Sequence, residues 1–131
     1  RVDRRQRQMC IRDRVYAARM RSLYHRHVET VGKAVDAGVP VYAGTDAGGT
    51  IAHGQIPTEI RLLSQLRDPL FGLGAASWRA RSWLTGDQVA AGLGVGAAAD
   101  LLVLDADPRR DVRVITHPTF VVLRGRVLRD R

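Results

Sequence analysis

The chain has 131 residues, of which 45% are hydrophobic, and this suffices for one domain with a packed core. No apolar stretch is long enough to span a bilayer, and the charged N-terminus lacks the apolar segment of a secretory signal. Cys10 is the sole cysteine, which excludes an internal disulfide. These features favour a cytoplasmic protein with no membrane partner.

The net charge of +8 raises the question of a nucleic-acid partner, and half of it lies in residues 1–14. This segment, RVDRRQRQMCIRDR, has six arginines against two aspartates, whereas the remaining charge is spread along the chain. Lys33 is the only lysine among 21 basic residues, a bias more typical of coding-sequence composition than of phosphate contacts. We therefore expect no nucleic-acid partner. The alternative is a small basic protein that binds nucleic acid through residues 1–14.

The same segment has a second peculiarity, because RQMCIRDR resembles a translated sequencing-adapter remnant. We expect residues 1–14 to be a non-native addition, and the alternative is a natural but disordered basic tail. On either interpretation the segment takes no part in the predicted fold.

The N-terminal half alternates between helical and strand patterns. Apolar residues recur every three or four positions over 16–37, which predicts a helix. The run VPVYAG at 39–44 is apolar on both faces, as in a buried strand of a parallel sheet. A Gly-rich loop over 45–56 leads to a helix predicted for 57–66, which has Pro57 in its first turn.

A further helix is predicted from residue 70 or 74 to residue 84, with Gly86 just beyond its end. The composition then changes: residues 87–99 are rich in glycine and alanine, and their apolar residues show no clear period. LLVLD at 101–105 predicts a short strand and VRVI at 112–115 a possible one. FVVLRGRVLR predicts a hairpin with its turn at Arg124-Gly125.

The loop after the predicted strand carries a lone carboxylate, Asp46, followed by two glycines and later by His53. A turn would use this aspartate to accept hydrogen bonds from the next backbone amides. A metal site would use its charge. Position alone favours the turn.

Several segments, taken in order, resemble the metal-dependent amidohydrolases, in particular their imidazolonepropionase-like and prolidase-like branch. VYAGTDAGG resembles the last barrel strand with its metal-site aspartate, and AASWRARSWL resembles the helix that closes the barrel. GAAADLLVLDADP and FVVLRGRVL are similar to the strand, turn and terminal hairpin of the family. The resemblance covers roughly residues 20–131.

This resemblance implies an α/β fold: the last β/α units of a (β/α)8 TIM-type barrel followed by the C-terminal part of a small β-sandwich. The chain would then be a C-terminal fragment, with the barrel portion at 15–86 and the sandwich portion at 87–131. A structural β-module formed by residues 87–131 alone is a further alternative.

The resemblance also implies the chemistry. Asp46 would be a metal ligand and the general base, while His53, Gly48 and Gly49 would contact substrate. One or two divalent cations, usually zinc, would activate water for attack on a small amide or cyclic amide. Complete members of the family are expected to be homo-oligomers. The first-strand histidine pair, the lysine and the mid-barrel histidines of the family are not found here, so the isolated chain is expected to be inactive.

Other residues of suggestive type have simpler interpretations. His25 and His27 spell the H-x-H of a first-strand metal motif, but they lie in a helical pattern, where their side chains diverge. Glu59 is expected to be a first-turn helix residue favoured by the macrodipole. Trp78 and Trp83 are expected to be packing residues.

Overall fold

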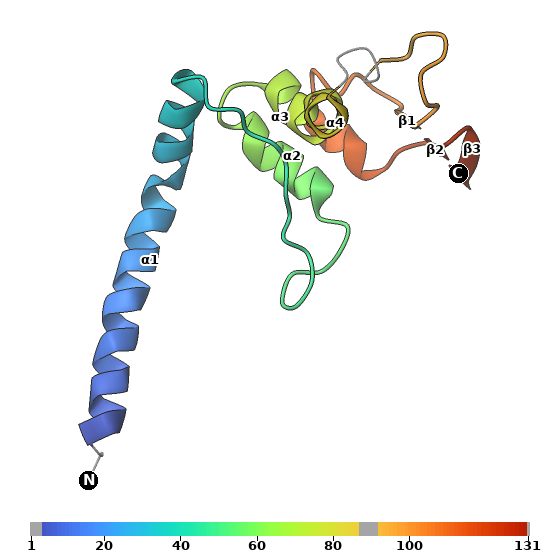
Figure 1. Ribbon diagram of the computed structural model, residues 1–131. Helices are drawn as coiled ribbons and strands as arrows, with labels where there is room; N and C mark the ends of the chain where they lie inside the picture. Colours follow the sequence, from blue (N-terminus) through green and yellow to red (C-terminus); the bar gives the residue numbers. More distant parts are fainter. Residues whose placement is uncertain (1–3, 87–91, 131) are drawn as a thin grey trace. The chain divides into compact units, whose positions relative to one another are not determined.

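The computed structural model describes residues 4–86 and 92–130 (Figure 1). The chain forms two compact units, Arg1–Val39 and Pro40–Arg131. The change of composition at residues 86–87 therefore falls inside the second unit. Residues 112–116 contact the helix at 56–64 of the same unit.

The first unit is built around one long helix, α1 (Arg4–Asp36). It confirms the helix predicted over 16–37. Its C-terminus is a Schellman motif: Gly38 has a φ of 84°, its N–H donates to the Val35 carbonyl, and the N–H of Val39 donates to that of Ala34.

The start of α1 lies in the segment expected to be a non-native addition or, alternatively, a disordered basic tail. Residues 4–14 are helical and continuous with the rest of α1, while residues 1–3 of the predicted tail lie outside the described residues. The first residues of the predicted sandwich portion, 87–91, also lie outside them.

The predicted fold class is wrong. Residues 39–47 form no strand. Beyond the Val39 N–H, which bonds the end of α1, the Ala43 N–H donates to the Ala75 carbonyl at 2.9 Å. Within residues 4–86 and 92–130 there is no parallel sheet, no barrel and no second sheet to complete a sandwich. A parallel strand needs a neighbouring strand for its ladder. An apolar run indicates burial but does not supply that neighbour.

The second unit begins with three short helices whose ends have clear local causes (Figure 1). The first is α2 (Ile56–Ser64), which has a proline in its first turn and confirms the helix predicted from 57. Next comes α3 (Pro69–Ala76), capped by Asp68, whose carboxylate accepts the Phe71 N–H at 2.7 Å. Last is α4 (Trp78–Thr85).

The single helix predicted to end at residue 84 is thus two helices. Ser77 separates α3 from α4, because its φ of −134° and ψ of −102° lie outside the helical region. The predicted end is confirmed, since Gly86 has a φ of 69° beyond α4.

Helices α2 and α3 approach closely at a glycine. A Cβ at Gly72 would lie 2.4 Å from the Ile60 carbonyl oxygen and 2.3 Å from the Ser64 hydroxyl. Ile60 and Leu63 of α2 and Ala75 of α3 are buried in this contact region. The absence of a side chain at residue 72 therefore sets how near the two helices lie.

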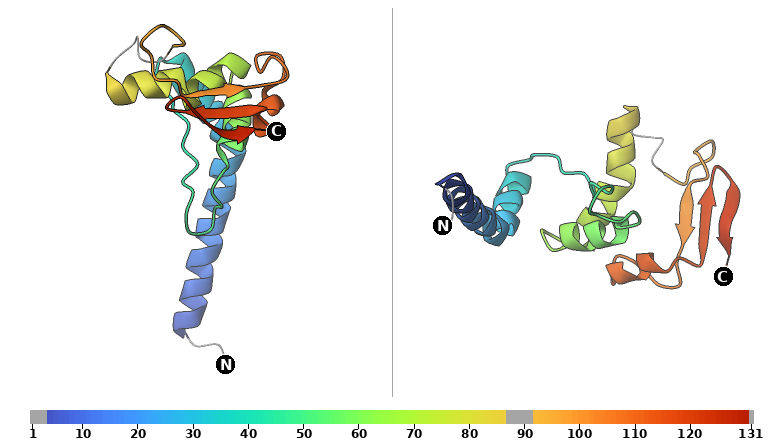
Figure 2. Two further views of the ribbon diagram at one scale, coloured as in Figure 1. Left: turned by 90° about the vertical axis from the view of Figure 1, so that its right-hand side faces the viewer. Right: turned by 90° about the horizontal axis from the view of Figure 1, so that it is seen from below.

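The sheet is antiparallel, with strand order β1-β2-β3 (Figure 2). Strand β1 (Leu101–Val103) pairs with β2 (Phe120–Leu123), and β2 pairs with β3 (Arg126–Asp130) across a bulge. The predicted hairpin is confirmed. Arg124 and Gly125 have φ values of 50° and 76°, the paired positive values of a type I′ turn.

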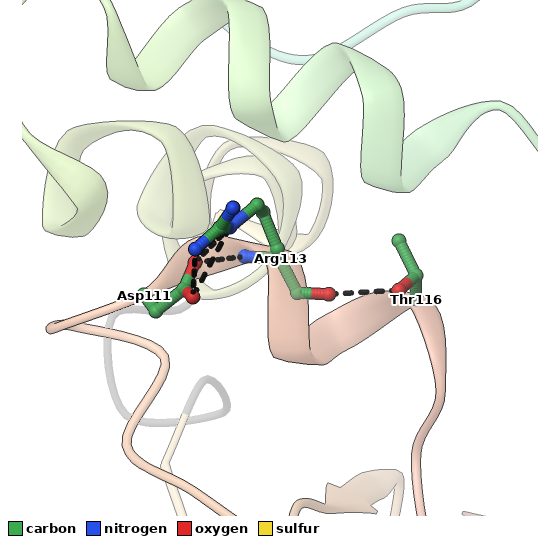
Figure 3. Close-up of polar contacts among 3 residues, drawn as sticks. All are labelled: Asp111, Arg113 and Thr116. Carbon is green, nitrogen blue, oxygen red and sulfur yellow. Dashed lines mark hydrogen bonds and ion pairs between the residues drawn. The ribbon is translucent and has the colours of Figure 1, made fainter.

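The possible strand at 112–115 is wrong, because this segment is a 3₁₀ helix, η1 (Val112–Thr116) (Figure 3). The Asp111 carboxylate accepts the N–H of Arg113 at 3.0 Å and also receives its guanidinium, and Thr116 Oγ1 donates to the Arg113 carbonyl at 2.7 Å. These local bonds favour a helical turn over the β preference of valine and isoleucine. Ile115 is buried beside α2.

The core of the second unit is small. Its buried hydrophobic residues among those described are Ile60, Leu63, Ala75 and Ile115, and of these Ala75 alone has no exposed surface; no large described side chain is fully buried. Many large apolar residues remain exposed, including several on the sheet. Among the described residues no helix combines the length and apolar character that crossing a membrane requires.

Candidate functional site

The loop that carries Asp46 has an unusual backbone. Asp46 has a φ of 49°, one of two positive values among the described non-glycine residues. The other, at Arg124, is required by the hairpin turn. A non-glycine residue in the left-handed region costs roughly 1 kcal/mol, although aspartate is among the residues that tolerate it best.

The backbone after Asp46 folds back on itself. Gly48 and Ile51 exchange two hydrogen bonds, of 2.9 Å and 3.2 Å, and Gly49 takes a φ of 57° between them. Both glycines are exposed, and a Cβ at either would meet no atom within 4 Å. The loop is therefore open next to Asp46, as a substrate mouth would require, but the structure contains no contact that assigns the glycines to substrate.

The Asp46 side chain does not cap this turn. It is exposed, and within the described residues it forms no hydrogen bond or ion pair. The expected turn role, in which the carboxylate accepts from the next amides, is thus not what this structure contains. The carboxylate is available to solvent, and the strain at its backbone is not explained by a structural bond.

The other predicted site residues are not assembled around Asp46. His53 is exposed, and Glu59 lies in the first turn of α2, as expected from the macrodipole. In the described parts of the chain no group of three or more His, Cys, Asp or Glu side chains could hold a metal ion. Asp46 can therefore offer one oxygen ligand or act as one base, and these residues complete no metal site.

The histidine pair and the tryptophans were interpreted from the sequence as non-catalytic. His25 and His27 are exposed on α1, which confirms the helical position predicted for them. Trp78 and Trp83 differ from simple core residues, because they are 38% and 63% exposed. Trp83 stacks on Tyr42, with ring centroids 4.9 Å apart and an interplanar angle of 22°.

That stack connects the loop to α4. Tyr42 lies four residues before Asp46, so the Trp83 contact and the Ala43–Ala75 hydrogen bond together fix the segment that leads into the loop. Sequence reasoning did not predict this pairing, because the two rings are far apart in the chain and neither lies in a recognisable motif.

The sequence also did not predict a polar cluster around Asp100. Asp100 receives the Arg81 guanidinium at 3.1 Å and the Arg124 backbone N–H at 2.7 Å. The Arg124 amide, followed by Arg81, lowers the pKa of the Asp100 carboxyl below its ordinary value. A cavity of about 720 Å³ lies beside these residues. The bonds tie α4, β1 and the hairpin turn together, which is a structural role.

Comparison with known proteins gives relatives but no assigned activity. No family model matches the chain. Over 112 residues, 85% of its length, it is 50% identical to uncharacterized proteins of Mycobacterium tuberculosis and Mycobacterium bovis. It spans 29% of the length of each of these relatives.

The chain is also similar to a solved structure. The crystal structure of an uncharacterized protein matches 87% of this chain with a TM-score of 0.73 and 26% sequence identity. The matched region is 29% of that protein's chain. The arrangement described above therefore also occurs inside a much longer polypeptide.

Proposed function

We propose that this sequence is part of a longer metal-dependent hydrolase of the amidohydrolase type, which cleaves carbon–nitrogen bonds in small amides or cyclic amides. Asp46 would be one metal ligand and the general base. The observation that carries the proposal is the state of Asp46: an exposed carboxylate, held at a φ of 49°, with no polar partner among the described residues. A strained backbone that no structural bond stabilises is found preferentially at functional sites.

The described residues alone do not fit a complete metal site. A catalytic zinc takes three protein ligands and keeps one open position, whereas the residues near Asp46 supply a single carboxylate. The longer protein would have to provide the remaining ligands. When bound, the cation would lower the pKa of water toward neutrality, and the Asp46 carboxylate would be the group that accepts the proton.

The remaining parts of the proposal follow from the family resemblance. Zinc is the favoured metal, Gly48, Gly49 and His53 would lie at the substrate mouth, and the complete enzyme would be a cytoplasmic homo-oligomer. The isolated chain would be inactive, because its described residues would supply one ligand to the metal.

The Mycobacterium tuberculosis relative allows a direct test. It should contain an aspartate at the position aligned with Asp46, carry bound zinc by elemental analysis, and hydrolyse members of a panel of amides and cyclic amides. Changing that aspartate to asparagine should lower kcat/KM by about 10²–10⁴-fold, the range for loss of a positioned acid–base group.

The same change in the 131-residue chain separates a chemical role from a structural one. Asparagine tolerates positive φ as aspartate does, so Asp46→Asn should alter the free energy of unfolding by less than about 0.5 kcal/mol. Two results would contradict the proposal: a relative without a carboxylate at this position, or an Asn variant with unchanged metal content and activity. Metal-dependent hydrolysis by the purified 131-residue chain, lost in Asp46→Ala, would contradict the partial-site interpretation.

A further inference from the structure

An open apolar groove runs between the helices and the sheet of the second unit. Its cavity has a volume of about 510 Å³. The helical side is formed by residues such as Ile60 and Leu73, and the sheet side by residues such as Leu102, Val122 and Leu128. Most of the surface that these residues present to the groove is hydrocarbon.

Apolar side chains on the sheet side of the groove are exposed to solvent. Leu102 is 51% exposed and Leu128 is 62% exposed, and they come from the two outer strands of the sheet. Leu123, next to the hairpin turn, is 47% exposed. Contiguous exposed apolar surface of this kind marks an interaction site.

The groove is not a closed core of the second unit. Ile60 and Ile115 are buried at its edge and Ala75 has no exposed surface, yet no large described side chain is fully buried. A domain with a complete core normally has several such side chains, because interiors are packed as densely as organic crystals. The helices and the sheet thus hold two apolar surfaces facing each other with space between them.

We propose that the groove is occupied by an apolar segment of the longer polypeptide to which this sequence corresponds. More than two thirds of each mycobacterial relative lies outside the matched region, so those proteins have ample chain to cover it. The solved structure has the same arrangement within a chain of which it forms 29%. The occupant is therefore an intramolecular segment that presents leucine, isoleucine, valine or phenylalanine side chains to both walls.

This proposal and the proposed function both assume a longer polypeptide, and they have no other premise in common. Its readouts are amide exchange and dye binding rather than hydrolysis. A relative with no hydrolase activity could still cover the groove, and an active one could leave it open.

The experiment compares the 131-residue chain with the Mycobacterium tuberculosis relative by hydrogen–deuterium exchange. In the relative, the amides aligned with β1 and with the η1 segment should exchange at least about tenfold more slowly than in the 131-residue chain. The dye 8-anilinonaphthalene-1-sulfonate should fluoresce with the 131-residue chain and much less with the relative. Leu102→Asp and Leu128→Asp should each lower the dye signal of the 131-residue chain.

Leu62→Asp is the matched control. Leu62 lies on α2, is 43% exposed and does not line the groove. At the aligned positions of the relative, the two groove substitutions should lower Tm clearly more than this control does. Should one groove variant fail to fold in the relative, the exchange comparison of the unmodified proteins still decides the question.

Three outcomes would overturn the proposal. The first is equal exchange and equal dye binding in the two proteins, which would mean that the groove stays open. The second is a 131-residue chain that sediments as a dimer whose groove amides are already protected, which would make a second copy the occupant. The third is a relative whose groove amides exchange slowly but whose groove still binds the dye as well as the 131-residue chain does, which would indicate a site for a free apolar ligand.

Discussion

Replacing Gly72 with alanine should destabilise the contact between α2 and α3. The new Cβ would lie 2.4 Å from the Ile60 carbonyl oxygen and 2.9 Å from the Ser64 backbone nitrogen. Backbone atoms cannot rotate away, so the helices would have to separate, and overpacking of this kind costs up to about 3 kcal/mol. Alanine favours the helical state by about 1 kcal/mol over glycine, which leaves a net loss of about 2 kcal/mol.

Two other helical glycines are matched controls. A Cβ at Gly32 in α1 would meet no atom within 4 Å, so Gly32→Ala should stabilise by about 0.5–1 kcal/mol. A Cβ at Gly74 would lie 2.8 Å from side-chain atoms of Trp78 and Arg79, which can move, so the cost there should be smaller than at Gly72.

Urea unfolding, followed by circular dichroism at 222 nm and by tryptophan fluorescence, measures all three variants. With a slope of about 2 kcal/mol per molar urea, the Gly72→Ala midpoint should fall by about 1 M. A Gly72→Ala protein as stable as the wild type, alongside a stabilised Gly32→Ala, would refute the inference that helix proximity depends on the missing side chain.

Three further predictions concern local bonds. Asp68→Ala removes the cap of α3 and should lower the free energy of unfolding by about 1 kcal/mol, whereas Asp68→Asn should be nearly neutral; equal losses in the two would contradict the capping role. The neighbouring Arg109 and Arg113 side chains lower the pKa values of Asp107 and Asp111 to about 2. The stability that these two pairs contribute is therefore present above pH 4 and is lost as the pH falls through 2. The ¹³C chemical shifts of the two carboxyl groups should titrate near pH 2 rather than near 3.8. Gly125→Ala places a Cβ at a φ of 76° and should lower Tm by several degrees, and an unchanged Tm would argue against the type I′ turn.

The sequence predicts correctly those elements whose causes are local. The start of α2 follows from a proline in its first turn, the end of α4 from Gly86, and the hairpin from Arg124-Gly125 between apolar runs. In each case residues within one turn determine the backbone. A single sequence is enough to identify them.

The failures have non-local or competing causes. The run at 39–44 has the composition of a buried strand, but a strand also needs a partner, and among residues 4–86 and 92–130 this segment has none. The VRVI segment has β-branched residues, yet the bonds around Asp111 favour a 3₁₀ turn. A composition-based preference is weak compared with a side chain that bonds its own neighbouring amide.

For the candidate site, the sequence identified Asp46 but not its surroundings. A carboxylate in a glycine-rich loop is visible in any sequence, whereas the Tyr42–Trp83 stack that steadies the approach to the loop requires the tertiary arrangement. The resemblance to amidohydrolases supplied the role of Asp46 as an expectation. The backbone at Asp46 supplies an independent reason to test it.

The bonds of Asp100 have a consequence for the order of folding. The carboxylate connects residues 19 and 24 positions away, at Arg81 and Arg124, whereas the contact between α2 and α3 joins neighbouring segments. Contacts of low sequence separation form first, because closing a long loop costs entropy before any bond is gained. The pair of helices should therefore be largely formed at the rate-limiting barrier and the Asp100 cluster should close after it. Loss of the Asp100 carboxylate should then leave the refolding rate almost unchanged and shorten the lifetime of the native state.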